Sequence, residues 1–352
     1  MRFKFTLFLL AFNLLAAGLI WFLSQRSPQR DAQSGGLSAM IGREVLDADR
    51  IELRGKHLPE PRTLERQGSA WKITQPLQWS ANYFAINRIL NQLQFLQAQA
   101  AFSVDEIHRT GQSLADYGLE DPWLTLTLAN ATQAIELSIG SHTEIGNHLY
   151  LLGPGGQQVF VVNRQVIDSL LIDLGDLRNR EIFSIPAFEI DALSLQAKAP
   201  ETVGTGAYKV RLARTNSGDW IFEAPLSAEA DPGRVATTIS ALTTATVVEF
   251  KDTETSDPVV QGLDNPTMRV TLQGNKRRQT LLIGNRDPGA QGQPTYFARL
   301  ADNPTVFTIA AQPFDELRQA DQALRERSFM NFDADALTSI DISEGALQIR
   351  LQ

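Results

Sequence analysis

Two histidines and a carboxylate lie close together between residues 141 and 148. His142, Glu144 and His148 fall within one turn-sized stretch, and imidazole and carboxylate groups are the zinc ligands left to a chain without cysteine. This stretch is therefore the best metal candidate in the sequence. Loop histidines that hydrogen-bond to water explain the same residues more simply. We expect no metal site here and no cofactor.

The other candidate constellations each lack a necessary part. The glycine-rich run 153–156 has no adjoining Lys and Ser/Thr and precedes a predicted strand, whereas a phosphate loop precedes a helix, so it indicates a hairpin turn. The acidic pairs 105–106 and 120–121 could do acid–base work on glycans, but they lie in polar connections where solvated charge is usual. The basic run 276–278 is expected at a hairpin tip, with contact to anionic lipid or a partner as the alternative. No G-x-S-x-G elbow occurs, and we expect a protein that is not an enzyme.

Composition excludes further classes of protein. The formal net charge of −8 gives no general basic field, so a nucleic acid partner is not expected. The chain has no cysteine, which removes disulfides, thiolate nucleophiles and iron–sulfur sites. At 352 residues it is longer than a single hydrophobic core usually grows, and two or more domains are expected.

An apolar run near the N-terminus predicts a membrane anchor. Residues 5–23 are apolar except for Thr6 and Asn13, which is long enough to cross about 30 Å of hydrocarbon as a helix. Arg2 and Lys4 precede the run and favour a cytoplasmic N-terminus. A cleaved signal peptide is the alternative, although its apolar region is normally only about 7–15 residues long.

These features predict the placement of the whole chain. Residues 1–26 are expected to form the cytoplasmic tip and transmembrane anchor, and residues 27–40 a flexible linker. The chain would then be a single-pass protein of the inner membrane that contacts the bilayer through residues 5–23. Its bulk would lie in the periplasm or another extracytoplasmic space.

The remainder repeats itself with a period of about 145 residues. The repeat predicts a first unit at 41–185 and a second at 186–331, with strands in 332–352 that complete the second unit. The paired landmarks are, in order, Trp71 to Pro76 and Trp220 to Pro225, Gly118-Leu119 and Gly262-Leu263, Ile139-Gly140 and Ile283-Gly284, Tyr150 and Tyr296, and Leu177 to Arg180 and Leu324 to Arg327.

Periodicity predicts an α+β fold for each unit, roughly β-α-β-β-β-β-α, with a mainly antiparallel sheet and helices packed on one side. The second unit's first helix should begin at the Asp231-Pro232 cap, and closing helices are expected at about 164–177 and 313–324. The residues expected on the buried stripes of the first helices are Phe84, Ile86, Ile89, Leu90, Leu93, Phe95 and Leu96, and Val235, Ile239 and Leu242.

From about Ile51 onward, these motifs resemble the bacterial domain-of-unknown-function family 4340. The resemblance rests on four motifs, which are the W-x-x-x-x-P strand, the Y-G-L-x-x-P turn, the L-x-I-G strand and the L-R-x-R segment that ends the unit. It implies a membrane-anchored protein, similar to auxiliary extracytoplasmic parts of ABC-type transport systems related to gliding motility. The family supplies no catalytic residues. The second copy departs from the pattern with Val260-Gln261 where the first has Asp116-Tyr117.

Four arginines at the ends of the closing helices are the candidate partner-docking residues. Arg178, Arg180, Arg325 and Arg327 would complement the negative end of a helix dipole, and docking of a partner is the alternative role. The expected function is that of an extracytoplasmic accessory or scaffold protein that binds other envelope membrane proteins. An ABC transporter permease or large extracytoplasmic subunit is the expected partner. An envelope carbohydrate- or lipid-binding module is the alternative function.

Overall fold

The computed structural model divides the chain into two compact units, with the boundary between Asn179 and Arg180. The second unit starts there because the carbonyl of Arg180 accepts a hydrogen bond of 2.8 Å from the amide of Val247, and Glu181 pairs with Thr246. The structure describes residues 41–42, 44–45, 47–56, 58–198, 208–251, 258–288, 292–328, 338–345 and 347–351. The expected anchor and linker, residues 1–40, lie outside these ranges. No helix within the described residues has the length and apolarity needed to cross a bilayer.

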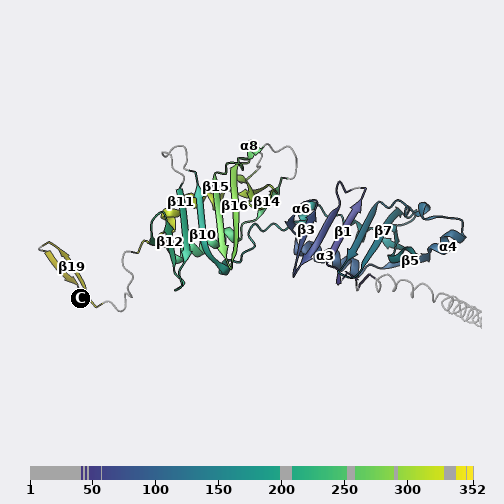
Figure 1. Ribbon diagram of the computed structural model, residues 1–352, viewed down its shortest axis with the longest axis horizontal. Helices are drawn as coiled ribbons and strands as arrows, with labels where there is room; N and C mark the ends of the chain where they lie inside the picture. Colours follow the sequence, from purple (N-terminus) through teal and green to yellow (C-terminus); the bar gives the residue numbers. More distant parts are fainter. Residues whose placement is uncertain are drawn as a thin grey trace, which may run out of the picture. The chain divides into compact units, whose positions relative to one another are not determined.

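The first unit is built on a nine-stranded sheet with the order β4-β3-β2-β1-β6-β7-β8-β9-β5 (Figure 1). Every pairing in it is antiparallel. The strands are β1 (Arg50–Gly55), β2 (Arg62–Gln67), β3 (Ala70–Gln75), β4 (Trp79–Ser80), β5 (Ala98–Ser103), β6 (Leu124–Ala129), β7 (Ala134–His142), β8 (His148–Leu152) and β9 (Gln158–Asn163).

The second unit repeats this sheet strand for strand, with the order β13-β12-β11-β10-β15-β16-β17-β18-β14. The predicted repetition of one antiparallel unit is therefore confirmed. The strands are β10 (Ile190–Ala197), β11 (Tyr208–Arg214), β12 (Trp220–Ala224), β13 (Ala228–Glu229), β14 (Val247–Phe250), β15 (Met268–Gly274), β16 (Arg277–Arg286), β17 (Thr295–Leu300) and β18 (Phe307–Ala310).

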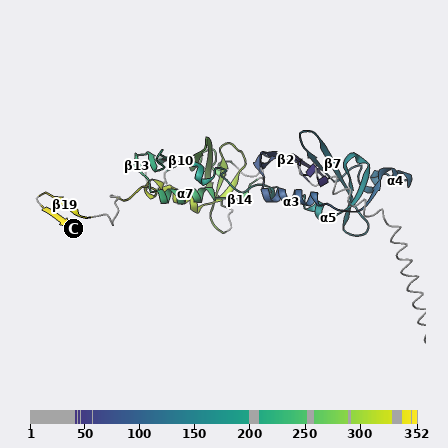
Figure 2. The same cartoon turned by 90° about the horizontal axis from the view of Figure 1, so that it is seen from below.

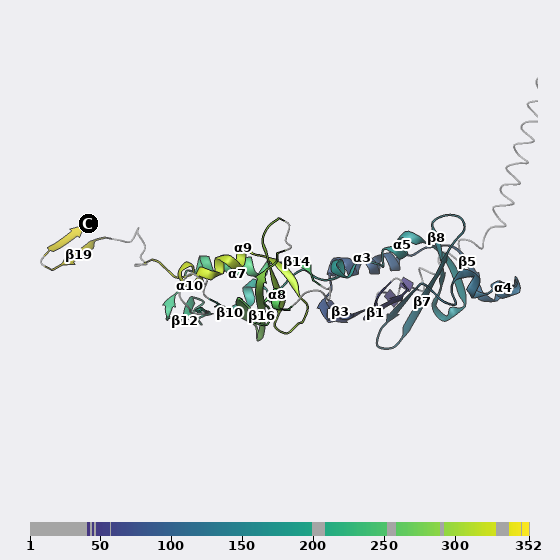
Figure 3. The same ribbon diagram turned by 90° about the horizontal axis from the view of Figure 1, so that it is seen from above.

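Helices line one face of each sheet, as Figures 2 and 3 show for α3 and α5 and for α7 and α9. The closing helices, however, are broken into short pieces. In the first unit the amides of Leu170 and Leu171 bond to carbonyls three residues back, which tightens the turn and ends the α-helix. The helices on this face are α3 (Tyr83–Gln94), α5 (Arg164–Asp168) and α6 (Leu174–Leu177), and α7 (Pro232–Thr243), α9 (Gln312–Glu316), η4 (Leu317–Gln319) and α10 (Ala320–Ala323).

The opposite face of each sheet is partly covered as well, so the prediction that all helices lie on one side was too simple. In β9, Phe160 belongs to the main core, whereas its neighbour Val159 faces the other way and packs with Ile107 and Leu119. Leu263, Leu282 and Phe297 form the matching small cluster of the second unit. The remaining short helices are α4 (Val104–Arg109), η1 (Leu114–Tyr117), η2 (Pro154–Gly156), η3 (Ala187–Glu189) and α8 (Pro258–Gln261).

The first helix of each unit begins at a side-chain cap and buries an apolar stripe. Asn82 accepts hydrogen bonds from the amides of Phe84 and Ala85, and Asp231 accepts one from Arg234, as the Asp-Pro signal predicted. The residues buried in the two helices include Ile86, Ile89 and Leu93, and Val235, Ile239 and Leu242.

Two members of the predicted buried stripe are instead exposed. Phe84 is 80% exposed and Phe95 is 69% exposed, so their assignment to the core was wrong. Phe84 precedes the buried Ile86 by two residues, which is about 200° around a helix of 3.6 residues per turn. Phe95 lies two residues beyond the buried Leu93, with the same consequence. The outer surface of α3 is therefore aromatic at both ends.

The glycine landmarks of the repeat touch one another in both units. Gly118 has a φ of 66° and Gly262 a φ of 67°, a left-handed conformation that favours glycine. A Cβ on Gly140 would lie 2.2 Å from the carbonyl oxygen of Tyr117, and one on Gly284 would lie 1.9 Å from that of Gln261. The turn thus rests directly on the strand, which explains why both motifs recur at a fixed separation.

The L-R-x-R segments close each unit against the start of its first helix. Arg178 forms a β-bridge with Ala81, and Arg325 forms the same bridge with Ala230. The adjacent amide of Asn82 donates to the carbonyl of Leu177 over 2.8 Å, and Asp231 donates to Leu324 over 2.9 Å. These arginines therefore belong to a backbone connection that joins the two ends of a unit.

The sequence comparison aligned Tyr150 with Tyr296, and this alignment was wrong by one residue. His142 pairs with Leu149 in the first sheet, and the equivalent Arg286 pairs with Tyr296 in the second. Tyr296 therefore occupies the position of Leu149, not of Tyr150. A shift of one residue moves a strand side chain to the other face of the sheet, so the two tyrosines point to opposite faces.

The C-terminal strands β19 (Ile340–Glu344) and β20 (Leu347–Leu351) pair with each other as a separate two-stranded sheet. We expected them to complete the second sheet, whose strand order contains neither. The edges of that sheet are taken by β13 and β14. Gly345, with a φ of 58°, lies in the short turn that lets the two C-terminal strands pair locally.

Candidate functional site

A cavity of about 410 Å³ in the first unit is lined by several polar side chains, among them His142 of the predicted metal candidate. It opens where the end of β7 meets α5, since His142 ends the strand and Arg164 begins the helix. Its lining residues are Trp123, Gly140, Ser141, His142, Arg164, Asp168 and Leu171.

The charges in this cavity compensate each other. Arg164 Nε lies 3.1 Å from Asp168 Oδ2, one helical turn away, so the carboxylate is engaged by the guanidinium and does not orient His142. The side chains of Ser141 and His142 share no hydrogen bond within the described part of the chain. The cavity can hold a small polar molecule, but it does not pose a base against a nucleophile.

The predicted metal candidate does not form a cluster. His142 lines the cavity, whereas His148 is half-buried at the start of β8, where its carbonyl accepts a hydrogen bond of 3.1 Å from the amide of Thr143. Glu144 is exposed. Across the residues that the structure describes, no group of three or more histidine, aspartate or glutamate side chains could hold a metal ion.

The glycine-rich run, the acidic pairs and the basic run lie in turns, at helix starts and at hairpins, which fits the structural interpretation of each. The glycine-rich run lies in η2, inside the hairpin of β8 and β9. Asp105 and Glu106 lie in the first turn of α4, and Asp121 pairs with Lys56. The basic run lies at the hairpin of β15 and β16, where Arg277 Nη2 is 2.5 Å from Glu189 Oε2.

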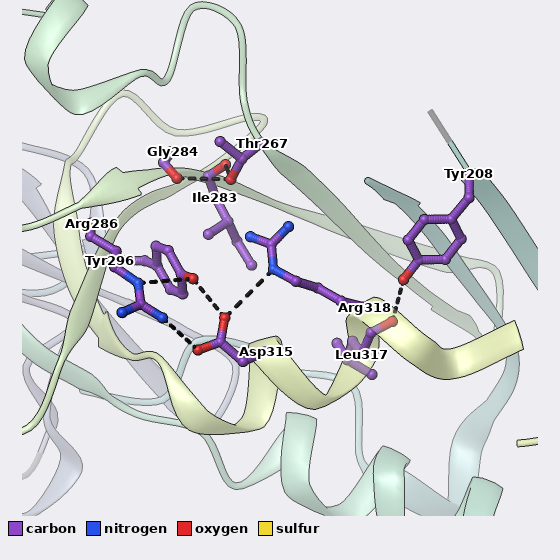
Figure 4. A network of polar contacts seen from close by, with 9 residues as sticks. All are labelled: Tyr208, Thr267, Ile283, Gly284, Arg286, Tyr296, Asp315, Leu317 and Arg318. Atoms are coloured by element: carbon purple, nitrogen blue, oxygen red, sulfur yellow. Dashed lines mark hydrogen bonds and ion pairs between the residues drawn. The ribbon is translucent and has the colours of Figure 1, made fainter. Parts of the chain in front are cut away.

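In the second unit, residues at positions equivalent to the cavity lining form a polar network (Figure 4). Leu149 pairs with Val162 and its equivalent Tyr296 pairs with Ile309, and Asp168 and Asp315 follow these two partners by the same number of residues, so the two carboxylates are equivalent. The hydroxyl of Tyr296 donates to Asp315 Oδ1 over 2.6 Å, and Arg286 Nη2 lies 3.0 Å from Asp315 Oδ2. Arg318 Nε lies 3.5 Å from the first of these oxygens.

The network fastens helices to the sheet rather than forming a reactive centre. Both guanidiniums lie over the ring of Tyr296, at 5.5 Å for Arg286 and 6.0 Å for Arg318. Nearby, the hydroxyl of Tyr208 on β11 donates to the carbonyl of Leu317. Burial raises the pKa of Tyr208 to about 12, with a further contribution from the charge of Asp321.

The four predicted docking arginines differ in their accessibility. Arg178 is fully buried and offers no surface to a partner, so it has a structural role. Arg180 is exposed, and its Nη1 donates to the carbonyl of Val248 over 3.0 Å. Arg325 is half-buried and Arg327 is exposed. The structure therefore does not gather the four into one patch.

Sequence reasoning missed a surface on the outside of α3, which we call the α3 surface and define by Phe84, Arg88, Asn91 and Phe95. These residues recur at spacings of four, three and four, which places them on one helical face. They line a shallow hollow of about 510 Å³. Tyr83, which is 60% exposed, meets Phe84 edge to face with ring centroids 5.7 Å apart. Helical spacing counted from the buried residues would have revealed this surface.

Comparison with known families gives one result. The family model described as Domain of unknown function (DUF4340) matches residues 71–258 and, a second time, residues 220–352. The two matches together cover more than half of the chain and reflect the repeated unit. No curated protein matches the sequence.

Proposed function

The chain belongs to the DUF4340 family, and from this premise we propose that it is a membrane-anchored accessory or scaffold protein of the cell envelope. It acts by binding another membrane protein through the α3 surface. The partner we propose is the permease or large extracytoplasmic subunit of an ABC-type transport system. The chain supplies a docking platform and carries out no chemistry of its own.

The exposed aromatic residues of α3 are the observation that carries the proposal. Phe84 and Phe95 are 80% and 69% exposed on a helix whose other face is fully packed. Burying a phenylalanine side chain contributes about 1.5–3 kcal/mol, so a folded protein gains little from leaving two of them in water. Aromatic side chains with an arginine nearby are typical of protein–protein interfaces, and Arg88 lies between the two rings along the helix.

The second unit shows that folding does not require this surface. Helix α7 has the same length and buries Val235 and Leu242 where α3 buries Ile86 and Leu93, but its corresponding outer positions are Gly233, Thr237, Ser240 and Thr244. Small and polar residues therefore suffice there. Two copies of one fold thus differ in a feature that packing does not need, which supports a binding role for the α3 surface.

The N-terminal run of residues 5–23 supports the proposed location of the partner. A chain held in the membrane by such a segment meets other membrane proteins at high effective concentration. An interface on α3 needs only an apolar groove or helix on the extracytoplasmic side of its partner. A subunit of an ABC-type transport system provides such a surface next to the bilayer.

The experiment is co-purification of the full chain from gently solubilised membranes. The wild-type chain should bring down an ABC-type permease or large extracytoplasmic subunit, identified by mass spectrometry. The double variant Phe84→Ser/Phe95→Ser should lose it, because two buried phenylalanines contribute about 3–6 kcal/mol to an interface. Recovery of the wild-type chain alone would overturn the proposal.

A matched control tests whether the effect belongs to α3. Ile145 is 88% exposed between β7 and β8 and Phe188 is 80% exposed in η3, so neither belongs to this helix. The double variant Ile145→Ser/Phe188→Ser removes a similar exposed apolar area and should retain the partner. Loss of the partner in both double variants would show that exposed apolar area in general, and not the α3 surface, is responsible.

A further inference from the structure

The second sheet has a polar cavity of about 300 Å³ on the face that its strands turn away from the helices. Alternation along the strands places its lining there, since Leu195 and Val270 beside it point into the core. The residues that line the cavity come from β10, β11, β15 and β16 and from the turn after β17. They are Ser194, Gln196, Lys209, Arg211, Arg269, Thr271, Arg278, Thr280 and Ala301.

Four of these side chains are cationic. Arg211 is compensated by Glu223, whose Oε2 lies 2.5 Å from its Nε. Lys209, Arg269 and Arg278 have no ion pair among the residues that the structure describes. Like charges gathered around one hollow repel each other, and an anion held between them would relieve that repulsion.

In the first unit, a buried carboxylate neutralises positive charge on the equivalent face of the sheet. Glu52 on β1 is only 8% exposed and pairs with Arg50 over 3.3 Å and with Arg54. Glu52 precedes Leu53, which pairs with Leu126. In the second sheet the residue at this position is Ser194, since Leu195 pairs with Val270 in the same way. The second unit thus lacks the central carboxylate of the first.

We propose that this cavity binds an oxyanion, in particular a phosphate-bearing group, in the place that Glu52 holds in the first unit. Lys209, Arg269 and Arg278 supply the charge, and guanidinium groups match the geometry of phosphate oxygens.

Hydroxyl groups in the lining of the cavity complete the donor set. Ser194 pairs across the sheet with Arg211 on one side and Thr271 on the other, and the hydroxyls of Thr271 and Thr280 are 2.9 Å apart and hydrogen-bonded to each other. None of the described residues that line the cavity is aromatic, so a neutral sugar would find no ring to stack on. The lining therefore favours charge recognition over recognition of an uncharged glycan.

The test is titration of the full chain, in an uncharged detergent, with inorganic pyrophosphate in a calorimeter. The wild-type chain should bind it, and the variant Lys209→Gln/Arg269→Gln/Arg278→Gln should bind at least about tenfold more weakly, since one lost charged contact alone is worth about that factor. The charge-matched variant Lys72→Gln/Arg109→Gln/Lys276→Gln, with three substitutions outside the cavity, should bind as the wild type does. Equal losses in the two triple variants would overturn the proposal.

Ser194→Glu gives the sharper result, because it installs the carboxylate of the first unit. It should abolish pyrophosphate binding while raising the melting temperature, which separates occupation of the site from misfolding. Ser194→Gln, with nearly the same size and no charge, should bind at least about tenfold better than Ser194→Glu. Equal binding by these two variants would refute the inference.

A second arm distinguishes a soluble phosphate from a lipid headgroup. The same chains are sedimented with vesicles of phosphatidylglycerol and of phosphatidylcholine. Stronger binding to phosphatidylglycerol than to phosphatidylcholine, lost in Ser194→Glu, would assign the site to a membrane phosphate, and pyrophosphate binding without this difference would assign it to a soluble one. Binding of neither probe by the wild-type chain would overturn the proposal without touching the proposed docking role of α3.

Discussion

Removing the carboxylate of Asp315 should destabilise the second unit far more than removing its first-unit equivalent, Asp168, destabilises the first. Tyr296 is only 5% exposed, and Asp315→Ala leaves its hydroxyl without the charged acceptor at 2.6 Å. Loss of such a bond costs about 1.5–3 kcal/mol, and the half-exposed pair with Arg318 adds up to about 1 kcal/mol. Asp168→Ala removes only a surface pair with Arg164, worth about 0.3–0.5 kcal/mol.

The comparison is controlled by the repeat itself. Asp168 is the last residue of α5 and Asp315 the last but one of α9, so the gain in helix propensity from alanine is small and similar in the two variants. Tyr296→Phe closes a double-mutant cycle. In that background Asp315→Ala should cost at least about 1 kcal/mol less than in the wild type, because the buried hydroxyl is already gone.

The assay is hydrogen exchange with mass spectrometry at increasing urea, which reports each unit through its own peptides. Peptides from β16, β17 and α9 give the free energy of opening of the second unit, and peptides from β7 and α5 give that of the first. Equal costs for the two alanine variants would refute the reasoning. So would a cost below about 0.5 kcal/mol for Asp315→Ala.

Three further substitutions have defined outcomes. Gly284→Ala should cost about 3 kcal/mol or more by urea unfolding, because its Cβ would meet the carbonyl of Gln261, whereas Gly175→Ala, with nothing within 4 Å, should be close to neutral. Asn82→Ala should cost about 1 kcal/mol in the same assay through loss of the cap of α3, and no measurable cost would show that the cap is dispensable. The neutral form of Tyr208 is favoured by folding, so its stabilisation is present below pH 10 and is lost as the pH rises towards about 12. Tyr208→Phe should therefore lose less stability than the wild type between these pH values, and identical pH profiles would contradict this.

The repeat could be predicted from sequence because its landmarks are set by backbone contacts. Gly140 and Gly284 are fixed by a carbonyl 2.2 and 1.9 Å from where a Cβ would be, and no other residue fits. The buried residues of α7 followed from helical spacing in the same way. Patterns that arise from short-range geometry leave a clear trace in the sequence.

The edge strands and the second-unit network could not be predicted in this way. Strand β5 reads Ala-Gln-Ala-Ala-Phe-Ser, without the alternation of a half-buried strand, and it is a strand because β9 pairs with it. Asp315 meets Arg286 from 29 residues away, so only the folded chain brings them together. Both sheets carry the same bulge, but His142 pairs with Leu149 whereas Arg286 pairs with Tyr296, so the connection to the next strand is longer in the second unit and the order of landmarks alone matched Tyr296 to Tyr150.

The basic cavity could not be predicted from the sequence for a similar reason. Lys209, Arg269 and Arg278 lie on three different strands, and in an acidic chain with a net charge of −8 no basic run marks them. Their gathering depends on the pairing of β10 with both β11 and β15. Comparison of the two units at Glu52 and Ser194 identifies the cavity where composition does not.

Site-specific photo-cross-linking tests the docking role of the α3 surface most directly. A photoreactive amino acid is placed at Phe84 in the full chain expressed in its native cells, and at Phe188 as an equally exposed control. The docking role predicts one dominant adduct from position 84, containing an ABC-type permease or large extracytoplasmic subunit, and none from position 188. No adduct at position 84, or the same adducts from both positions, would contradict it.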